Sequence, residues 1–170
     1  RAIGASNVSL DHLKEYIQHG QLDVIQEKYS LLDRRIEKEL LPFCEANNIT
    51  LQTYSPIEQG LLTGKVQSDY KVKPGEAREN KKWWLPKNIK LANEMLLGWK
   101  DLTEKYNCSL VNLVINWTML QSKHINVLCG ARKLEQVEEN IQSANFVLQP
   151  DDIIRMTQDA DQIIAQSENK

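Results

Sequence analysis

The sequence predicts an α/β protein in which four strands alternate with helices. Short apolar segments recur four times along the 170 residues, each ends in polar residues or glycine, and each is followed by a segment with helical spacing of apolar residues. Strands that alternate with helices are usually parallel and joined by right-handed crossovers. This pattern fits either a small doubly wound sheet or half of a (β/α)8 barrel, which takes roughly 250 residues in full.

The first strand is expected in residues 1–5, as a buried apolar run. Ser9 can then cap a helix over residues 10–19, which Gly20 would end in a left-handed conformation. Because the chain opens on Arg1 directly before this strand, with no initiator methionine or signal peptide ahead of it, we expect the sequence to be truncated.

The second strand is expected at residues 23–26, and apolar residues at helical spacing predict a helix within residues 34–48. Pro42 removes one backbone donor from that helix. The third strand is expected at residues 49–54, and a long polar loop follows it at residues 60–88. Loops of more than about 15 residues in a compact domain are usually lids or binding loops, so this loop is a place to look for function.

The remaining elements complete the alternation and add extra helices. One helical face runs from Ile89 to Tyr106, and a further helix begins at Ser109. The fourth strand is expected at residues 125–129, followed by a helix over residues 134–144. The last helix opens at Pro150, since proline is tolerated in a first turn.

The composition indicates no charged or membrane partner. With 21 Lys and Arg against 23 Asp and Glu, the net charge is -2, and neither nucleic acid nor an anionic membrane is favoured. The apolar runs fall far short of the roughly 20 residues of a transmembrane helix. Three cysteines without CxxC spacing argue against a disulfide framework and a structural zinc site, so a reducing cytoplasm and no metal are expected.

Polar residues follow each predicted strand, where parallel α/β proteins bind ligands. Asn and Gln side chains each offer a donor and an acceptor, which suits a flat amide such as nicotinamide, and an aromatic side chain could stack on such a ring. Each of these residues alone is more often a turn former or a helix cap. They are Ser6, Asn7, Gln26, Tyr54, Ser55, Pro56, Gly130, Ala131 and Arg132.

Two segments give a more specific indication. Residues 54–65 (YSPIEQGLLTGK) resemble the loop after strand seven of aldo-keto reductases, and residues 130–140 (GARKLEQVEEN) resemble the cofactor segment after their strand eight. Residues 3–7 (IGASN) and 26–34 (QEKYSLLDR) are similar to strands five and six of the same family. The resemblance therefore implies that residues 1–170 are a single unit, the C-terminal half of a (β/α)8 TIM barrel, with residues 60–88 as its long loop.

The resemblance implies NADP(H) as the cofactor. Ser6, Asn7 and Gln26 match the positions that hold the nicotinamide carboxamide, and Tyr54 matches the aromatic residue that stacks on the ring. The stretch that follows the pyrophosphate is matched by Ser55, Pro56, Ile57, Glu58 and Gln59. Lys65 and Arg78 match a loop lysine and arginine of channel-associated members. The adenosine site is matched by Gly130, Arg132, Gln136, Glu139 and Asn140, with Arg132 and Lys133 placed to meet a 2′-phosphate.

Two residues depart from the family pattern. Glu58 puts a carboxylate into the pyrophosphate loop, which would weaken anion binding unless its side chain points to water. Leu134 stands where many relatives have proline, which loosens the entry to the following helix. We expect a small effect from the second departure.

The catalytic residues of the family are expected to lie outside this chain. Family chemistry needs an aspartate, a tyrosine, a lysine and a histidine from strands two to four, with the tyrosine as general acid. The tyrosines and histidines present here fall on helices, on the loop or at a strand entry, so none is assigned a catalytic role. We therefore expect the parent enzyme to reduce aldehydes or ketones to alcohols, and this chain alone to be inactive.

Two other functions stay open at this point. A non-catalytic nucleotide-binding or regulatory subunit would use the cofactor site for sensing. A self-standing half-barrel would have to cover two open sheet edges, by pairing with a second copy as a homodimer. The expected partners are therefore a small carbonyl substrate, the N-terminal half of the barrel, and a second copy if the half-barrel stands alone, when the chain would be marginal or aggregation-prone.

Overall fold

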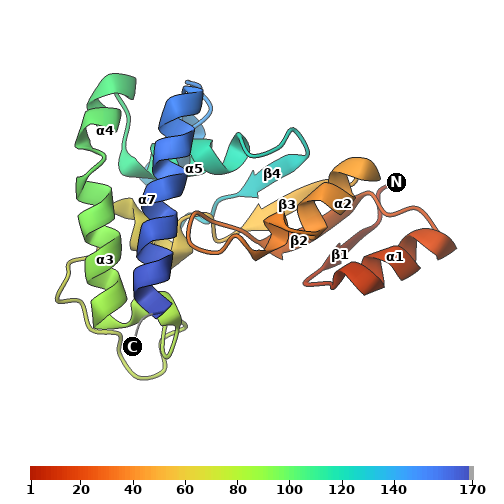
Figure 1. Cartoon of the computed structure of the whole chain (residues 1–170), viewed down its shortest axis with the longest axis horizontal. Coiled ribbons are helices and arrows are strands. Elements are labelled where there is room, and N and C mark those ends of the chain that lie inside the picture. The colour runs from red at the N-terminus through yellow and green to blue at the C-terminus, as the bar shows by residue number, and fades with distance from the viewer. Residues whose placement is uncertain (169–170) are drawn as a thin grey trace. The chain divides into compact units, whose positions relative to one another are not determined.

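The computed structural model describes residues 1–168, which form two compact units. The first unit comprises residues 1–56 and 118–130 and carries the sheet. The second comprises residues 57–117 and the chain from Ala131 onward, and it is helical in the described part. The alternation of strands and helices along the chain is as predicted (Figure 1).

The first unit is built on a four-stranded parallel sheet with the order β1-β2-β3-β4. Its strands are β1 (Gly4–Ser6), β2 (Val24–Lys28), β3 (Thr50–Tyr54) and β4 (Ile125–Leu128). The register sets Ser6 beside Gln26 and Gln26 beside Gln52. Polar side chains from three neighbouring strands therefore lie in one row across the sheet.

The helices of the first unit are α1 (Leu10–His19) and α2 (Leu40–Ala46), with a 3-10 helix at Arg35–Glu37. Ser9 caps α1 as predicted, because its side chain accepts a hydrogen bond from the His12 N–H. The expected left-handed stop at Gly20 is wrong: its φ of 176° is extended, and α1 ends there without that turn. Pro42 is tolerated because it lies in the first turn of α2, where helix N–H groups have no intrahelical acceptor.

The two central strands bury their alternate side chains and the edge strand does not. Ile25 of β2 and Leu51 of β3 are fully buried. The expected burial of the first strand is wrong. β1 is three residues long, lies at the sheet edge, and is preceded by the exposed Ile3. A Cβ at Gly4 would lie 2.6 Å from Val24 Cγ1, so glycine is what lets β1 approach β2 this closely.

The second unit opens with 3-10 helices at Glu58–Thr63 and Lys82–Trp84, one at each end of the long loop. Its α-helices are α3 (Pro86–Leu97), α4 (Lys100–Tyr106), α5 (Leu110–Met119, with its last two residues in the first unit), α6 (Leu134–Gln142) and α7 (Pro150–Glu168). The helix expected from Ile89 begins three residues earlier, at Pro86, since proline is accommodated at the first helical position. It also does not continue to Tyr106, because α3 ends at Leu97 and α4 starts separately.

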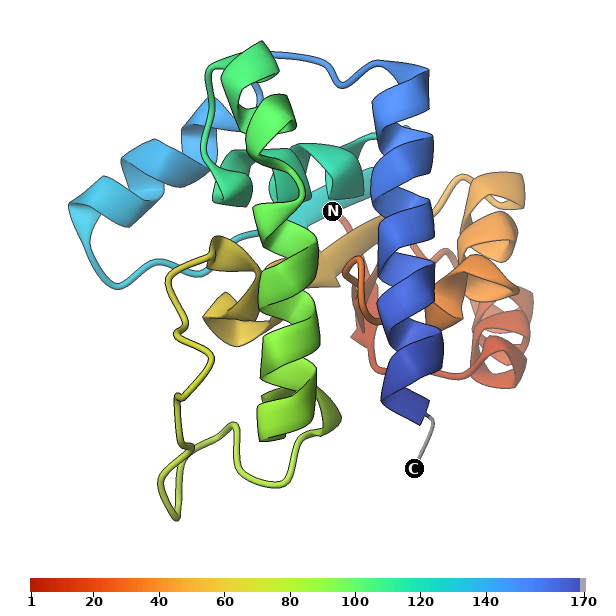
Figure 2. The ribbon, with the colours of Figure 1, turned by 60° about the vertical axis from the view of Figure 1, so that its left-hand side comes forward.

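Buried tryptophans connect the long helix α7 to the rest of the second unit. α3 and α7 lie side by side (Figure 2). Trp99 Nε1 donates to Asp159 Oδ2 at 2.7 Å, and Trp117 Nε1 donates to Thr157 Oγ1 at 3.0 Å. Arg155 of α7 donates to the Gly98 carbonyl at 2.6 Å, between α3 and α4. These bonds satisfy polar atoms that would otherwise be costly to bury.

Helix α6 differs from the others because none of its residues is buried. The apolar positions that predicted it are present on one face, but Leu134 and Ile141 remain 69% and 64% exposed. The Trp83–Trp84 pair, by contrast, is buried. Across residues 1–168, no helix is both long enough and apolar enough to cross a membrane.

Candidate functional site

Three of the predicted residues meet at the carboxyl ends of β1 and β3 in the first unit. Tyr54 Oη donates to Asn7 Oδ1 at 2.8 Å, and Asn7 Nδ2 lies 3.0 Å from Ser6 Oγ. The φ of Asn7 is +54°, in the left-handed region that asparagine tolerates better than most residues. This turn brings the Asn7 amide, the Ser6 hydroxyl and the Tyr54 ring to one exposed place, as the sequence predicts.

Gln26 lies next to that cluster, and it has an unpredicted companion. Its Nε2 donates to Gln52 Oε1 at 3.0 Å. Within residues 1–168 the Gln26 Oε1 accepts no hydrogen bond, so it can receive an N–H from a ligand amide. Gln52 was missed, although its position two residues before Tyr54 places it on the same face of β3 as that tyrosine.

Glu27 is a second residue that the sequence analysis missed. It follows Gln26 in β2, is only 9% exposed, and its Oε1 accepts the Val8 N–H at 2.6 Å. Burial raises the pKa of this carboxyl above its ordinary value, while the N–H groups of Val8 and Asn7 and the charge of Arg35 oppose that rise. Glu27 lies two residues after the apolar Ile25 and therefore on the same face of β2, and this position was the available signal.

The other predicted residues of the first unit shape the chain ends around it. Ser55 has a φ of +57° and turns the chain directly after β3, ahead of Pro56. At Gly130, after β4, no heavy atom lies within 4 Å of a built Cβ, so the surroundings are open. Burial raises the pKa of the neighbouring Cys129 thiol to about 11, so this thiol is protonated at neutral pH and is a poor nucleophile.

In the second unit, the predicted pyrophosphate stretch forms a backbone turn suited to an anion. Ile57 has right-handed dihedrals (φ -101°, ψ 22°), and Glu58 and Gln59 follow with φ of +47° and +56°. Successive right-handed and left-handed residues direct neighbouring N–H groups into a concavity that binds anions. Tight anion binding was expected to require the Glu58 side chain to point to water. It does not, because the residue is only 4% exposed.

The structure brings Arg78 and Gln59 together, although the resemblance matched them to different parts of the cofactor site. The Arg78 guanidinium lies 4.3 Å from the centroid of the Trp84 ring, and its Nη2 donates to the Gln59 carbonyl at 2.8 Å. Its Nη1 also lies 3.3 Å from Tyr70 Oη. Arg78 therefore fixes the turn that carries the N–H concavity, by stacking and hydrogen bonding.

The predicted adenosine residues lie on and before α6. Lys65 Nζ pairs with Glu139 Oε2 at 3.0 Å, and the Arg132 N–H donates to Gln136 Oε1 at 2.7 Å. Lys133 is the extended residue just before α6, and the Asn140 carbonyl accepts the Ser143 N–H at the end of that helix. The structure thus pairs the side chains of Gln136 and Glu139, and that of Lys65, with partners within the chain.

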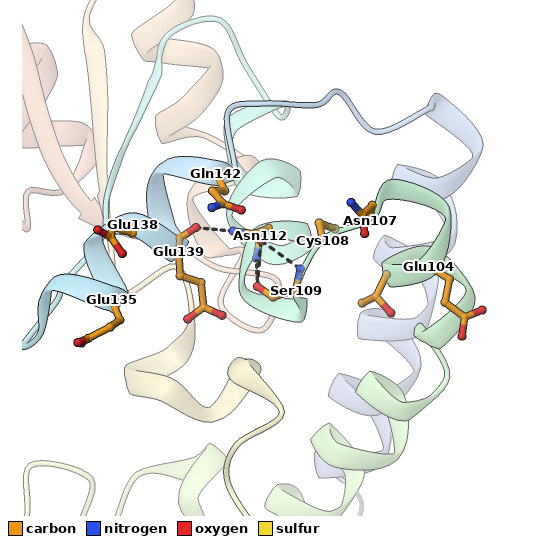
Figure 3. Close-up of a pocket in the computed structure, with 10 residues that line it drawn as sticks. Glu104, Asn107, Cys108, Ser109, Asn112, Glu135, Glu138, Glu139 and Gln142 are labelled. Atoms are coloured by element: carbon orange, nitrogen blue, oxygen red, sulfur yellow. Dashed lines mark hydrogen bonds between the residues drawn. The ribbon is translucent and has the colours of Figure 1, made fainter.

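A groove of about 680 Å³ runs between α4, α5 and α6 in the second unit (Figure 3). Asn112 connects α5 to α6 and to the start of its own helix. Its Nδ2 donates to the Glu139 carbonyl and to Ser143 Oγ, and its Oδ1 accepts from the Ser109 N–H. Four carboxylates line the groove, so its electrostatic potential is negative. The lining residues are Thr103, Glu104, Asn107, Cys108, Ser109, Asn112, Glu135, Glu138, Glu139 and Gln142.

Within residues 1–168, no three His, Cys, Asp or Glu side chains are grouped in a way that could hold a metal ion.

A parallel α/β fold with amide, hydroxyl and aromatic side chains at its strand ends is the arrangement in which such proteins bind ligands. Comparison with known proteins makes the class specific. The chain belongs to the aldo/keto reductase family, whose family model matches residues 1–160.

Individual relatives agree with this assignment. The chain is 47% identical over 161 residues to the NADH-specific methylglyoxal reductase of Escherichia coli, covering 95% of this chain and 49% of the relative. It is 29% identical to a probable voltage-gated potassium channel subunit beta of rice, over 73% of this chain and 39% of the relative. The chain thus spans about half the length of the curated relatives it matches.

Solved structures show the same fold. The glycerol dehydrogenase of Gluconobacter oxydans superposes with a TM-score of 0.86 and 27% identity, over 100% of this chain and 50% of the other. A thermostable aldo-keto reductase gives a TM-score of 0.69 at 18% identity, covering 94% of this chain and 48% of the other. The four strands and their helices are therefore a partial (β/α) barrel, as the sequence predicts.

Proposed function

We propose that this chain supplies the cofactor-binding half of a nicotinamide-dependent carbonyl reductase. The observation that carries the proposal is the Ser6–Asn7–Tyr54 cluster at the strand ends, with the open Gln26 oxygen next to Ser6 in the register. The relative named as a methylglyoxal reductase supports a 2-oxoaldehyde as the substrate. When bound, the nicotinamide cofactor supplies a hydride to the carbonyl carbon, the oxygen takes a proton, and an alcohol results.

The residues of this chain bind and orient; they do not transfer the proton. The Gln26 oxygen and the Ser6 hydroxyl are suited to the donor and acceptor of a carboxamide, and the Tyr54 hydroxyl is tied to Asn7, which fixes the plane of its ring for stacking. In the second unit, the N–H concavity at residues 57–59 suits phosphate oxygens. The proton donor is proposed to come from the N-terminal half of the barrel, which would be this chain's partner.

The form of the cofactor rests on two opposing observations. Arg132 and Lys133 support NADP(H), since two cations at one place can bind a 2′-phosphate. The NADH-specific relative supports NADH instead, and so do the carboxylates of Glu135, Glu138 and Glu139 that follow these cations on α6. The ratio of the dissociation constants for NADPH and NADH decides between them: Arg132→Ala weakens only NADPH if the 2′-phosphate binds there.

The proposal is tested by measuring cofactor binding through the fluorescence of the nicotinamide. We expect Tyr54→Ala and Gln26→Ala to weaken NADH binding about fivefold, because each removes a stacking or hydrogen-bonding contact worth about 1 kcal/mol. Tyr16→Ala, an exposed tyrosine on α1, is the control. If the unchanged protein and the three variants bound NADH equally, the nicotinamide would not bind at this cluster.

A second candidate function is a regulatory subunit that binds the cofactor without turnover. The likeness to the rice channel subunit favours it, and the loop residues Lys65 and Arg78 were matched to channel-associated members. NADH oxidation in the presence of methylglyoxal separates the two functions, measured with the N-terminal half of the barrel present. Cofactor binding without turnover would support the regulatory subunit.

Two further proposals concern partners and location. A second copy of the chain is proposed to cover α6 when the N-terminal half is absent, because Leu134, Val137 and Ile141 expose one apolar face.

A cytoplasmic location is proposed because Cys44, Cys108 and Cys129 are all free thiols, which suits a reducing compartment.

A further inference from the structure

We propose that Glu27 is a positioning residue, whose carboxylate holds the turn after β1 in the shape that presents Ser6 and Asn7. The inference rests on the proposed function, since it concerns the same nicotinamide-side cluster. It assigns a role to a side chain that makes no contact with the expected ligand.

The turn is held at two consecutive backbone groups, both by β2. The Asn7 N–H donates to the Gln26 carbonyl at 3.0 Å, which continues the strand pairing by one residue. The next N–H, of Val8, has no strand partner left and instead donates to Glu27 Oε1 at 2.6 Å. The chain can therefore leave the sheet at Asn7 with a φ of +54° and still satisfy both N–H groups.

The same carboxylate lies just before α1, which begins at Leu10 after the cap Ser9. A negative charge is favourable near a helix N-terminus. Glu27 thus connects the end of β1 to the start of α1, and the segment between them holds Asn7, whose Oδ1 receives the Tyr54 hydroxyl. Movement of this segment would move the amide and release the tyrosine.

Burial disfavours the charged form of Glu27, and it is this charged form that accepts the Val8 N–H. Desolvation raises the pKa of its carboxyl despite the hydrogen bond from Val8, so the folded protein binds a proton there more readily than the unfolded chain does. A raised carboxyl pKa opposes folding once the pH passes above the unfolded value. An uncharged side chain of similar size relieves that desolvation, but without an acceptor it leaves the Val8 N–H unpaired, and the turn is loosened.

The first measurement is the rate of amide hydrogen exchange at Val8, which is monitored by NMR in the absence of any cofactor. Glu27→Met removes the acceptor at nearly constant volume, and we expect Val8 to exchange at least tenfold faster. Glu27→Gln keeps an acceptor oxygen and should restore slow exchange. If Glu27→Met does not fold, Glu27→Ala serves as the second variant without an acceptor.

Asp23 offers a matched control in the same strand pair. It lies just before β2, and its Oδ2 accepts the Ile3 N–H at 2.7 Å, so it makes the same kind of bond at the opposite end of β1. Asp23→Ala should speed exchange at Ile3 and leave Val8 unchanged. Unchanged Val8 exchange in both Glu27→Met and Glu27→Ala would overturn the inference.

The second measurement compares NADH with ADP-ribose, which lacks the nicotinamide. In Glu27→Met we expect NADH affinity to fall about fivefold to tenfold and ADP-ribose affinity to stay the same, with rescue in Glu27→Gln. Equal loss for both ligands, or no loss for NADH, would contradict the positioning role. If the unchanged protein binds ADP-ribose and NADH equally, the proposed nicotinamide site fails, and exchange at Val8 alone decides whether Glu27 holds the turn.

Discussion

Single carboxylates carry much of the polar organisation of the helical unit. Asp152 of α7 accepts hydrogen bonds from Lys105 and from the Tyr106 hydroxyl of α4, and the same hydroxyl accepts the Gln149 N–H at 2.9 Å. Desolvation raises the pKa of Asp152, but the bonds from Lys105 and Tyr106 outweigh it and the pKa is lowered. Asp152 and Tyr106 together therefore join α4, α7 and the entry to α7.

The lowered pKa gives a stability effect with a defined sign. A carboxyl whose pKa is lower in the folded state stabilises the fold above its ordinary value, here 3.8, and loses that contribution as the pH falls through the folded value. We expect Asp152→Asn to lower the free energy of unfolding by about 1 kcal/mol at pH 7. The difference from the unchanged protein should shrink as the pH falls below 3.8 and through the lowered pKa of the folded state, as measured by urea unfolding.

The matched control is Asp151→Asn, at the exposed neighbouring position of the same helix. It alters the charge near the same helix start without touching the bonds to α4. A pH-independent difference for Asp152→Asn, or the same profile in both variants, would show that the bonds to α4 are not responsible.

Two glycines show how a backbone conformation and a close contact add up. Gly64 and Gly75 have φ of +71° and +82°, which other L-residues adopt at a cost of about 1 kcal/mol. A Cβ at Gly64 would also lie 2.5 Å from Leu110 Cδ1, whereas nothing lies within 4 Å at Gly75. We expect Gly64→Ala to lower the free energy of unfolding by about 2 kcal/mol and Gly75→Ala by about 1 kcal/mol. Equal losses in urea unfolding would mean that Leu110 moves aside freely.

At the scale of elements, the local cap at Ser9 was predicted correctly, the local stop at Gly20 was not, and partners distant in sequence were not predicted. Ser9 identified the start of α1 because a cap acts on N–H groups only three residues away. Glu27 escaped notice because its partner Val8 is 19 residues away and the bond exists only once β1 and β2 pair. The break between α3 and α4 was missed for the same reason, since Arg155 of α7 holds the Gly98 carbonyl from 57 residues away.

The loop between the two 3-10 helices has Arg78 as a central side chain, beside the bonds from Asn93 to Val66 and Ser68. Arg78 stacks on Trp84 and bonds to the Gln59 carbonyl, so it ties the far part of the loop to its beginning. We expect Arg78→Met to speed proteolytic cleavage within residues 64–81 several-fold, because both contacts are lost. Lys71→Met, at an exposed position in the same loop, is the control. Cleavage at the same rate in both variants would mean that the loop holds its shape without Arg78.

At the scale of the whole molecule, the alternation of elements was predictable and the exposure of α6 was not. Helical spacing shows that Leu134, Val137 and Ile141 share a face, but it cannot show whether anything covers that face. In the structure they are 69%, 41% and 64% exposed. The candidate site divides in the same way, because residue types at strand ends were readable while their hydrogen-bond partners required the fold.

The exposed face of α6 predicts association of the isolated chain. We expect the apparent mass in sedimentation velocity to rise with protein concentration, since burying these side chains recovers about 25 cal/mol per Å². The double variant Leu134→Glu with Ile141→Glu should remain monomeric. Gln142→Glu adds charge to the same helix outside the apolar face and should associate as before; a monomer at every concentration would contradict the prediction.

All four tryptophans of the chain, at positions 83, 84, 99 and 117, belong to the helical unit. Their emission therefore reports on that unit alone, and red shifts on denaturation follow the release of Trp99 and Trp117 from Asp159 and Thr157. Far-ultraviolet circular dichroism at the same time records the sheet as well. Superimposable melting curves from the two signals would mean that both units unfold as one cooperative body, and a gap between them would measure directly how independently each unit folds.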